Sequence, residues 1–218
     1  CIGEKSFLAD VEMMELAYTS LKLVGIKRIT IEISSRVFFD KFVSSIKDNS
    51  KRDEIIRLIK LKDLQGLLKI LDKKNHQYIK DIFSCTGKYK DKKNNLKKLG
   101  IDKNSSKEIF NIENIIKIFL KRNKSVNIFL DLCEIDNKNY HSGVRYTFFA
   151  HDVRGEIARG GRYFVNSSLN KNDATGFTCY MDTILRASSL VIIQKKILVP
   201  FKVSKSKIKE LLEKNYAI

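Results

Sequence analysis

The chain contains no tryptophan, has one proline among its 218 residues, and carries far fewer acidic than basic residues, 25 against 42. It has no run of about 18 apolar residues, so we expect no membrane-spanning helix. The opening residues Cys1 to Lys5 lack the apolar stretch of a secretory signal peptide. With 43% hydrophobic residues the chain can still bury a sizeable core, and we expect one compact domain.

Cysteines are few and scattered, at Cys1, Cys85, Cys133 and Cys179, and no two of them form a Cys-x-x-Cys pair. This spacing supports neither a zinc site nor a disulfide framework. We therefore expect reduced, largely buried thiols and a cytoplasmic location. The glycine-rich phosphate-binding loops of nucleotide-binding proteins are also absent from the sequence, and we expect no cofactor and no metal.

The net charge of +17 invites a nucleic-acid interpretation. The lysines, however, are spread along the chain and alternate with Asn and Ile, as in Lys90–Asn95. Such a bias often reflects an AT-rich coding sequence. Basic patches interleaved with exposed aromatics, which are typical of single-strand binding, are not evident. Nucleic acid is therefore an alternative partner and not the leading one.

Residues 10–34 have the periodicity of a helix followed by a strand. Asp10 is a candidate N-cap, apolar residues follow at helical spacing, and Gly25 is the expected stop. Residues 28–34 alternate as a strand does. From about residue 36 to 122 the pattern is helical, with Asp63 and Ser105-Ser106 as candidate caps. Within this region the lysine-rich residues 86–107 predict a mobile turn segment.

From Val126 the hydrophobic period changes to that of strands, which predicts an antiparallel sheet. A helix over 183–190 and a last amphipathic helix over 204–215 are predicted beyond it. The expected strands are residues 126–132, 146–150, 156–164 and 175–181, with a further short strand at 197–201.

The most informative feature is the segment Ala158-Arg159-Gly160-Gly161-Arg162-Tyr163, which follows Tyr140-His141-Ser142-Gly143. A polar turn at residues 151–155 lies between them, so the two segments predict a hairpin. Two glycines inside a strand are costly unless a ligand, a bulge or another backbone comes close. The flanking arginines offer donors for a carboxylate or a phosphate. Taken alone, these residues fit equally well a strand with a glycine bulge and surface arginines.

The combination of these segments with Ala174-Thr175-Gly176-Phe177 and Asp182 resembles the catalytic fold of class II histidyl-tRNA synthetases. The resemblance is closest to the regulatory subunit of ATP phosphoribosyltransferase. It extends from Ile2 to about Leu190, and the run Lys62-Asp63-Leu64-Gln65-Gly66-Leu67 is similar to the helical insertion of that subunit.

This resemblance implies an α+β fold, a class II aminoacyl-tRNA synthetase-like antiparallel sheet with flanking helices. The expected domain covers residues 1–190, with a helical insertion at about 36–122. Residues 191–218 would be a short C-terminal extension without an anticodon-binding domain. The first class II motif would precede Cys1, so we expect an N-terminally truncated chain.

The resemblance also implies a histidine-type ligand pocket without catalytic residues. Its expected members are Tyr140, His141, Gly143, Arg159, Gly160, Gly161, Arg162, Tyr163 and Gly176. We expect Arg162 and Tyr163 to contact the ligand and Tyr140 to line the wall. For His141 a hydrogen-bonded structural role is the main alternative, since no Asp or Ser lies at triad spacing.

Three departures from the synthetase pattern argue against amino-acid activation. The arginine expected four residues before the Tyr-aromatic-Ser/Thr-Gly unit is replaced by Asp136, and the one expected after Asp182 is replaced by Thr183. Arginine binds phosphate oxygens through a planar, permanently charged fork, which neither replacement provides. Lys5 occupies a position where a carboxylate normally receives the amino group of histidine, and a cation there repels it.

The implied function is therefore that of a non-catalytic regulatory subunit in the first step of histidine biosynthesis. It would activate a short catalytic subunit and help mediate feedback by histidine, as a dimer within a hetero-octamer. One alternative is a divergent histidyl-tRNA synthetase fragment, which would require arginines at positions 136 and 183, where this chain has none. The other is a basic RNA-binding paralogue, whose affinity for RNA would fall as the salt concentration rises.

Overall fold

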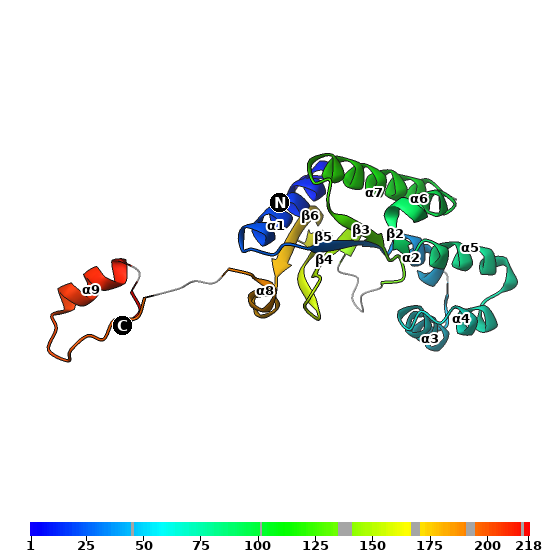
Figure 1. Cartoon of the computed structure of the whole chain (residues 1–218). Helices are drawn as coiled ribbons and strands as arrows, with labels where there is room; N and C mark the ends of the chain where they lie inside the picture. Colours follow the sequence, from blue (N-terminus) through cyan, green and yellow to red (C-terminus); the bar gives the residue numbers. More distant parts are fainter. Residues whose placement is uncertain (45, 101, 135–140, 167–170, 191–194, 215) are drawn as a thin grey trace. The chain divides into compact units, whose positions relative to one another are not determined.

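The computed structural model describes residues 1–44, 46–100, 102–134, 141–166, 171–190, 195–214 and 216–218 (Figure 1). The chain divides into two compact units, Cys1–Ser188 and Ser189–Ile218. The first unit contains the sheet and most of the helices. None of the described helices is long and apolar enough to cross a membrane.

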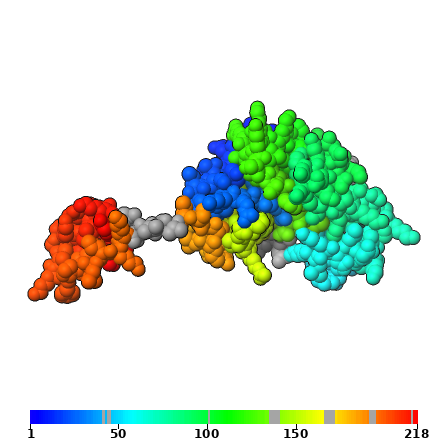
Figure 2. Space-filling view, in the orientation of Figure 1, coloured from blue at the N-terminus to red at the C-terminus, as the bar shows by residue number. Residues whose placement is uncertain are grey.

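The first unit begins with helix α1 (Phe7–Leu23) and strand β1 (Ile29–Ser35), and the helical insertion follows. The insertion contains α2 (Val37–Ser44), α3 (Asn49–Lys60), α4 (Leu64–Ile70), α5 (Lys73–Ser84), β2 (Gly87–Lys88), α6 (Tyr89–Lys97) and α7 (Lys103–Arg122). The remaining elements are β3 (Asn127–Leu130), β4 (His141–Ala150), β5 (Glu156–Asn166), β6 (Lys171–Cys179) and α8 (Met181–Ala187). In Figure 2 the insertion forms a continuous surface, coloured cyan to green, beside the blue surface of α1.

The six strands form one sheet in the order β2-β3-β1-β4-β5-β6. All neighbouring pairs are antiparallel except β1 and β3, which are parallel. The prediction of an antiparallel sheet is therefore wrong at this pair. The reason is the insertion between the two strands, because a parallel pair needs a long crossover and α7 provides it.

Register separates the sheet into an apolar face and a polar face. Ile31, for example, lies opposite both Ile128 of β3 and Phe148 of β4, and all three are buried. Helices α1 and α7 lie side by side on this face (Figure 1). The rings of Tyr18 and Phe119 meet edge to face between them, with centroids 5.5 Å apart. Most of the core lies in this layer.

Helix α1 begins one turn earlier than the sequence suggests. Ser6 is its N-cap, and its side chain accepts a hydrogen bond from the backbone N–H of Leu8 at 3.2 Å. Asp10, the predicted cap, lies inside the helix and is buried. Its carboxylate is directed to an arginine of the sheet, an interaction between residues far apart in the sequence that no local pattern reveals.

The lysine-rich segment 86–107 is mostly ordered structure, in contrast to the prediction of a mobile turn region. It contains β2, α6 and the first turn of α7, and fully buried Leu96 and Leu99 anchor it to the core. Asp102 caps α7 through the N–H groups of Asn104 and Ser105, so the predicted Ser105-Ser106 cap is wrong. The predicted Asp63 cap of α4 is confirmed by its bond from Gly66 N at 2.8 Å.

Lys62 connects the insertion to the sheet. It has a left-handed backbone (φ 55°), which is uncommon for a residue with a side chain. Its ammonium group forms a short ion pair with the buried carboxylate of Asp131, directly after β3. The insertion is thus joined to the sheet by a charge pair in addition to its apolar packing.

The second unit contains α9 (Lys205–Glu213), capped by Ser204. The predicted strand at 197–201 is wrong: these residues form no strand, and Ile197 N only donates to Ala217 O at 2.9 Å beside an isolated bridge between Lys196 and Ala217. Leu198 and Phe201 are exposed, so the apolar pattern that suggested a strand does not mark buried positions within this unit.

Glu108 of α7 generates a pH prediction. Its carboxylate is buried, accepts a short hydrogen bond from Ser35 Oγ, and faces Asn111, Asp10 and Arg162. Burial raises the pKa of Glu108 in the folded state, so the stability it contributes is present below its unfolded pKa and lost as pH rises through its folded pKa.

Glu108→Gln resembles the protonated form at every pH. The variant should therefore gain stability relative to the parent as pH rises from 4.5 to 7.5, by about 1.4 kcal/mol per unit of pKa difference. Urea unfolding at several pH values measures this. Glu12→Gln, on the exposed face of α1, is the control, and an equal pH trend in both variants would contradict the prediction.

Candidate functional site

The polar face of the sheet carries the candidate site. Two rows of side chains cross it in register: Glu32, Thr147, Arg159 and Thr178 form one, and Ser34, Arg145, Gly161 and Gly176 form the other. The first row is charged or polar throughout, and the second ends in two glycines. The sheet therefore presents charge on β1, β4 and β5, and open space over the paired glycines of β5 and β6.

A hollow of about 310 Å³ lies over the glycine end of these rows, and we call it the glycine hollow. A volume of this size suits a small molecule. Its floor is formed by Gly160, Gly161 and Gly176, and Cys1 and Ile2 form one side. The other lining residues are His141, Arg159, Tyr163, Thr175, Phe177, Thr178 and Tyr180.

Close packing explains the two consecutive glycines. A Cβ on Gly160 would lie 2.4 Å from the carbonyl oxygen of Gly176 and 2.5 Å from the ring of Tyr146, which passes beneath it. A Cβ on Gly161 would lie 2.7 Å from the carbonyl oxygen of Val144. Both positions therefore exclude side chains. Gly176 differs, because a Cβ there would meet only Tyr163 Oη, at 3.9 Å.

Arginines and carboxylates alternate beside the hollow. Arg159 binds Glu156 at 2.5 Å, and Glu134 lies 3.1 Å from Arg145 and 3.9 Å from Arg159. Burial raises the pKa of Glu156, and Arg159 opposes the shift. Burial, together with the carboxylates of Asp131 and Glu134, raises the pKa of Glu32 as well. The hollow thus borders groups of both signs, which suits a ligand that carries both an ammonium and a carboxylate.

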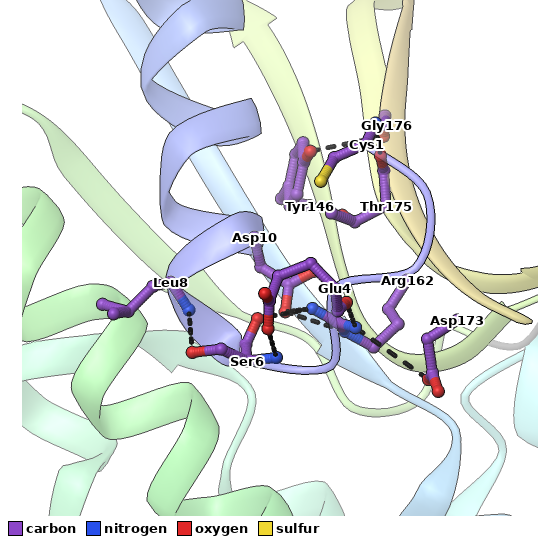
Figure 3. A network of polar contacts seen from close by, with 10 residues as sticks. All are labelled: Cys1, Glu4, Ser6, Leu8, Asp10, Tyr146, Arg162, Asp173, Thr175 and Gly176. Atoms are coloured by element: carbon purple, nitrogen blue, oxygen red, sulfur yellow. Dashed lines mark hydrogen bonds and ion pairs between the residues drawn. The ribbon is translucent and has the colours of Figure 1, made fainter.

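Arg162 lies under the sheet, on the face covered by α1. Its Nε and Nη2 donate to Asp10 Oδ2 at 3.0 and 2.8 Å, and the residue is 9% exposed (Figure 3). Nη1 also donates to Glu4 O at 2.8 Å and Nη2 to Ser6 O at 2.7 Å. Arg162 is not among the residues that line the glycine hollow.

The other predicted pocket residues are divided between the hollow and its surroundings. His141, Arg159, Gly160, Gly161, Tyr163 and Gly176 line the hollow together. Gly143 does not line it, and a Cβ there would touch the stem of Arg162 at 3.5 Å. Tyr140 lies outside the described residues, as does Asp136. Whether these residues bind a ligand remains a prediction.

Two of the three positions that depart from the synthetase pattern lie within the described residues, and neither lines the hollow. Lys5 is exposed and does not line the hollow, and Thr183 is buried in α8. Position 183 carries no arginine, but Arg186 lies one helical turn later, and its Nη2 donates to Thr183 Oγ1 at 3.3 Å.

Sequence reasoning missed two carboxylates of the site, Glu134 and Glu156. Both belong to motif-poor stretches. Glu134 reaches Arg159 from the chain after β3, and Glu156 reaches it along β5, where the pairing with β4 is irregular between Phe148 and Phe149. The spacing of Glu156 and Arg159 is only a weak sign of an ion pair, because side chains three residues apart in a regular strand point to opposite faces of the sheet. The side formed by Cys1 and Ile2 was also missed, because it depends on pairing with β6.

The sheet, its helix-covered apolar face and the hollow on its polar face define a class II aminoacyl-tRNA synthetase-like α+β fold. Solved structures support this assignment. The chain superposes with a TM-score of 0.71 on an ATP phosphoribosyltransferase regulatory subunit/histidyl-tRNA synthetase from Bacillus halodurans, at 18% identity, covering 97% of this chain and 56% of that one. The score is 0.68 for histidyl-tRNA synthetase from Nostoc sp. PCC 7120, at 20% identity, covering 98% and 57%. The predicted fold class is confirmed.

The family follows from the sequence match. The histidyl-tRNA synthetase family profile matches residues 1–184, so the chain belongs to the histidyl-tRNA synthetase family. Among curated relatives, an ATP phosphoribosyltransferase regulatory subunit from Ruminiclostridium cellulolyticum is 30% identical over 85% of this chain and 46% of its own length. The subunit from Rhodospirillum centenum is 25% identical over 91% and 51%. The chain spans about half the length of these relatives. Their identity with this chain confirms the predicted resemblance to regulatory subunits.

The glycine floor generates a paired prediction. Gly160→Ala should destabilise the protein by about 3 kcal/mol or more, because the new methyl collides with a carbonyl and a ring. Gly176→Ala should leave stability within about 1 kcal/mol of the parent, because its methyl points into open space. Thermal and urea unfolding distinguish them. Equal losses in the two variants would contradict the packing explanation.

Proposed function

We propose that this protein is a non-catalytic regulatory subunit of ATP phosphoribosyltransferase, in the first step of histidine biosynthesis. It activates a short catalytic subunit and binds histidine, the feedback effector, in the glycine hollow. The observation that carries the proposal is a small-molecule hollow bordered by charges of both signs, in a chain that lacks arginines of the synthetase pattern.

The hollow suits an amino acid in size and in charge. Its volume of about 310 Å³ accommodates a small zwitterion. Arg159 can share its guanidinium between Glu156 and a ligand carboxylate, and Glu156 can accept from an ammonium group. The rings of Tyr163 and Phe177 provide apolar walls for an imidazole. We propose His141 as a further residue that contacts the ligand.

A non-catalytic role follows from the replaced arginines. Adenylate formation needs fixed cations at the phosphate oxygens, and a threonine at position 183 supplies none. Arg186 is exposed and bonds within its own helix, to Asp182 and Thr183. Regulation needs only that ligand and partner each favour one conformation of the subunit, so it tolerates these losses.

The partner is a short-form catalytic subunit that transfers phosphoribosyl to ATP, and the assembly is a hetero-octamer built on dimers of this protein in the cytoplasm. A solved complex supports this pairing by fold: the ATP phosphoribosyl transferase (HisG:HisZ) complex from Thermotoga maritima matches with a TM-score of 0.62, at 16% identity over 81% of this chain. We propose no metal and no cofactor.

The test is the formation of phosphoribosyl-ATP by a short catalytic subunit with and without this protein, across a histidine titration. We expect stimulation that histidine reverses, and co-elution of the two proteins. Gly176→Ala should raise the half-inhibitory histidine concentration by about tenfold, because its methyl narrows the hollow. Arg154→Gln, on the exposed hairpin turn, is the control and should match the parent.

Two outcomes would replace this function with another. Histidine-dependent exchange of pyrophosphate into ATP by this protein alone would indicate a synthetase. Absence of stimulation and co-elution, together with RNA binding that weakens steeply with salt, would indicate a nucleic-acid-binding paralogue.

A further inference from the structure

The first six residues form a segment that both closes the hollow and leads into α1. Cys1 and Ile2 line the hollow, and Ile2 pairs with Ala174 at the outer edge of β6. Gly3 N donates to Asp173 O at 2.8 Å and Thr175 N to Cys1 O at 2.9 Å. We call Cys1–Ser6 the N-terminal segment.

Beyond Gly3 the N-terminal segment leaves β6, and Arg162 is what holds it. The guanidinium donates to the carbonyl oxygens of Glu4 and Ser6 and to the Asp10 carboxylate at the same time (Figure 3). A planar fork with several donors is suited to such a junction, because one group fixes three acceptors at set angles. The segment, the start of α1 and β5 therefore meet at one side chain.

The charge of this junction is largely balanced within the protein. Arg162 is buried with Asp10, and Asp173 Oδ1 lies 3.9 Å from its Nη1. A buried arginine that already binds a carboxylate and two carbonyls has little capacity left for a ligand. Its neighbour on the other face of β5, Arg159, is instead directed to the hollow. The two arginines of the Arg-Gly-Gly-Arg motif thus have different roles.

We propose that Arg162 is a positioning residue for the glycine hollow: it holds the N-terminal segment against β6 and so sets the affinity for the ligand without touching it. This inference rests on the proposed function only in taking histidine as the ligand of the hollow. The holding of the segment itself is independent of that function and is tested separately.

The first measurement is amide hydrogen exchange in the whole protein without ligand. Arg162→Gln should speed the exchange of Gly3 and Thr175 by about tenfold or more, because the segment is released from its carbonyl contacts. Amides of α7 should keep their protection. Arg162→Lys keeps the charge but not the fork and should have an intermediate effect. Arg154→Gln should behave as the parent.

Loss of Arg162 also leaves the Asp10 carboxylate buried without its main partner, which can unfold the protein. The double variant Asp10→Asn/Arg162→Gln removes both charges and separates the two effects. It should regain the thermal stability lost in Arg162→Gln while Gly3 and Thr175 still exchange fast. Its histidine affinity, measured by calorimetry, should stay about tenfold or more below that of the parent.

The outcomes are distinct. Parent-like exchange of Gly3 and Thr175 in the double variant would overturn the proposal and reduce Arg162 to half of a buried ion pair. Fast exchange with unchanged histidine affinity would overturn its link to the hollow. If the parent itself does not bind histidine, the proposed function fails, whereas the exchange result still decides whether Arg162 positions the segment.

Discussion

The buried ion pair between Asp10 and Arg162 is the contact on which the arrangement of this protein depends. It joins the first turn of α1 to the middle of β5, and without it one of the two charges would remain in the core unpaired. Because Arg162 also binds the carbonyls of Glu4 and Ser6, the direction in which the chain enters α1 is set by the sheet. The helix, the sheet and one side of the hollow are therefore not independent parts.

The two faces of β5 show how one short motif serves two purposes. Gly160 and Arg162 face α1, where Gly160 admits the ring of Tyr146 and Arg162 carries the charge. Arg159, Gly161 and Tyr163 face the hollow, where space and mixed charge are needed. Alternation along a strand separates these roles by one residue. A shift of register by one position would exchange them, and the bulge in β4 between His141 and Arg145 occurs where β4 pairs with this motif.

Local patterns predict much of this fold, and the errors have physical causes. The strands of the hairpin and the Asp63 cap follow from alternation and from side-chain chemistry within a few residues. Asp10 and Arg162, by contrast, were assigned to a cap and to ligand contact, since their mutual bond spans 152 positions of sequence. The glycine pair was correctly identified as a place of close approach, yet only the fold shows that the approaching groups are Tyr146 and main chain. Glu134 joins the site from the chain after β3, and Glu156 does so beside an irregularity in the pairing of β4 and β5, which no local pattern reveals.

The parallel pairing of β1 and β3 has a consequence for how the insertion can change in length. The chain leaves β1 at Ser35 and must return to the opposite end of the sheet before β3 begins at Asn127. Helix α7, with 20 residues, spans about 30 Å and makes that return by itself. Its length is therefore tied to the length of the strands. Helices α2 to α5 precede β2 and carry no such constraint, so whole helices can be gained or lost between Val37 and Ser84 while the strands and the hollow stay as they are.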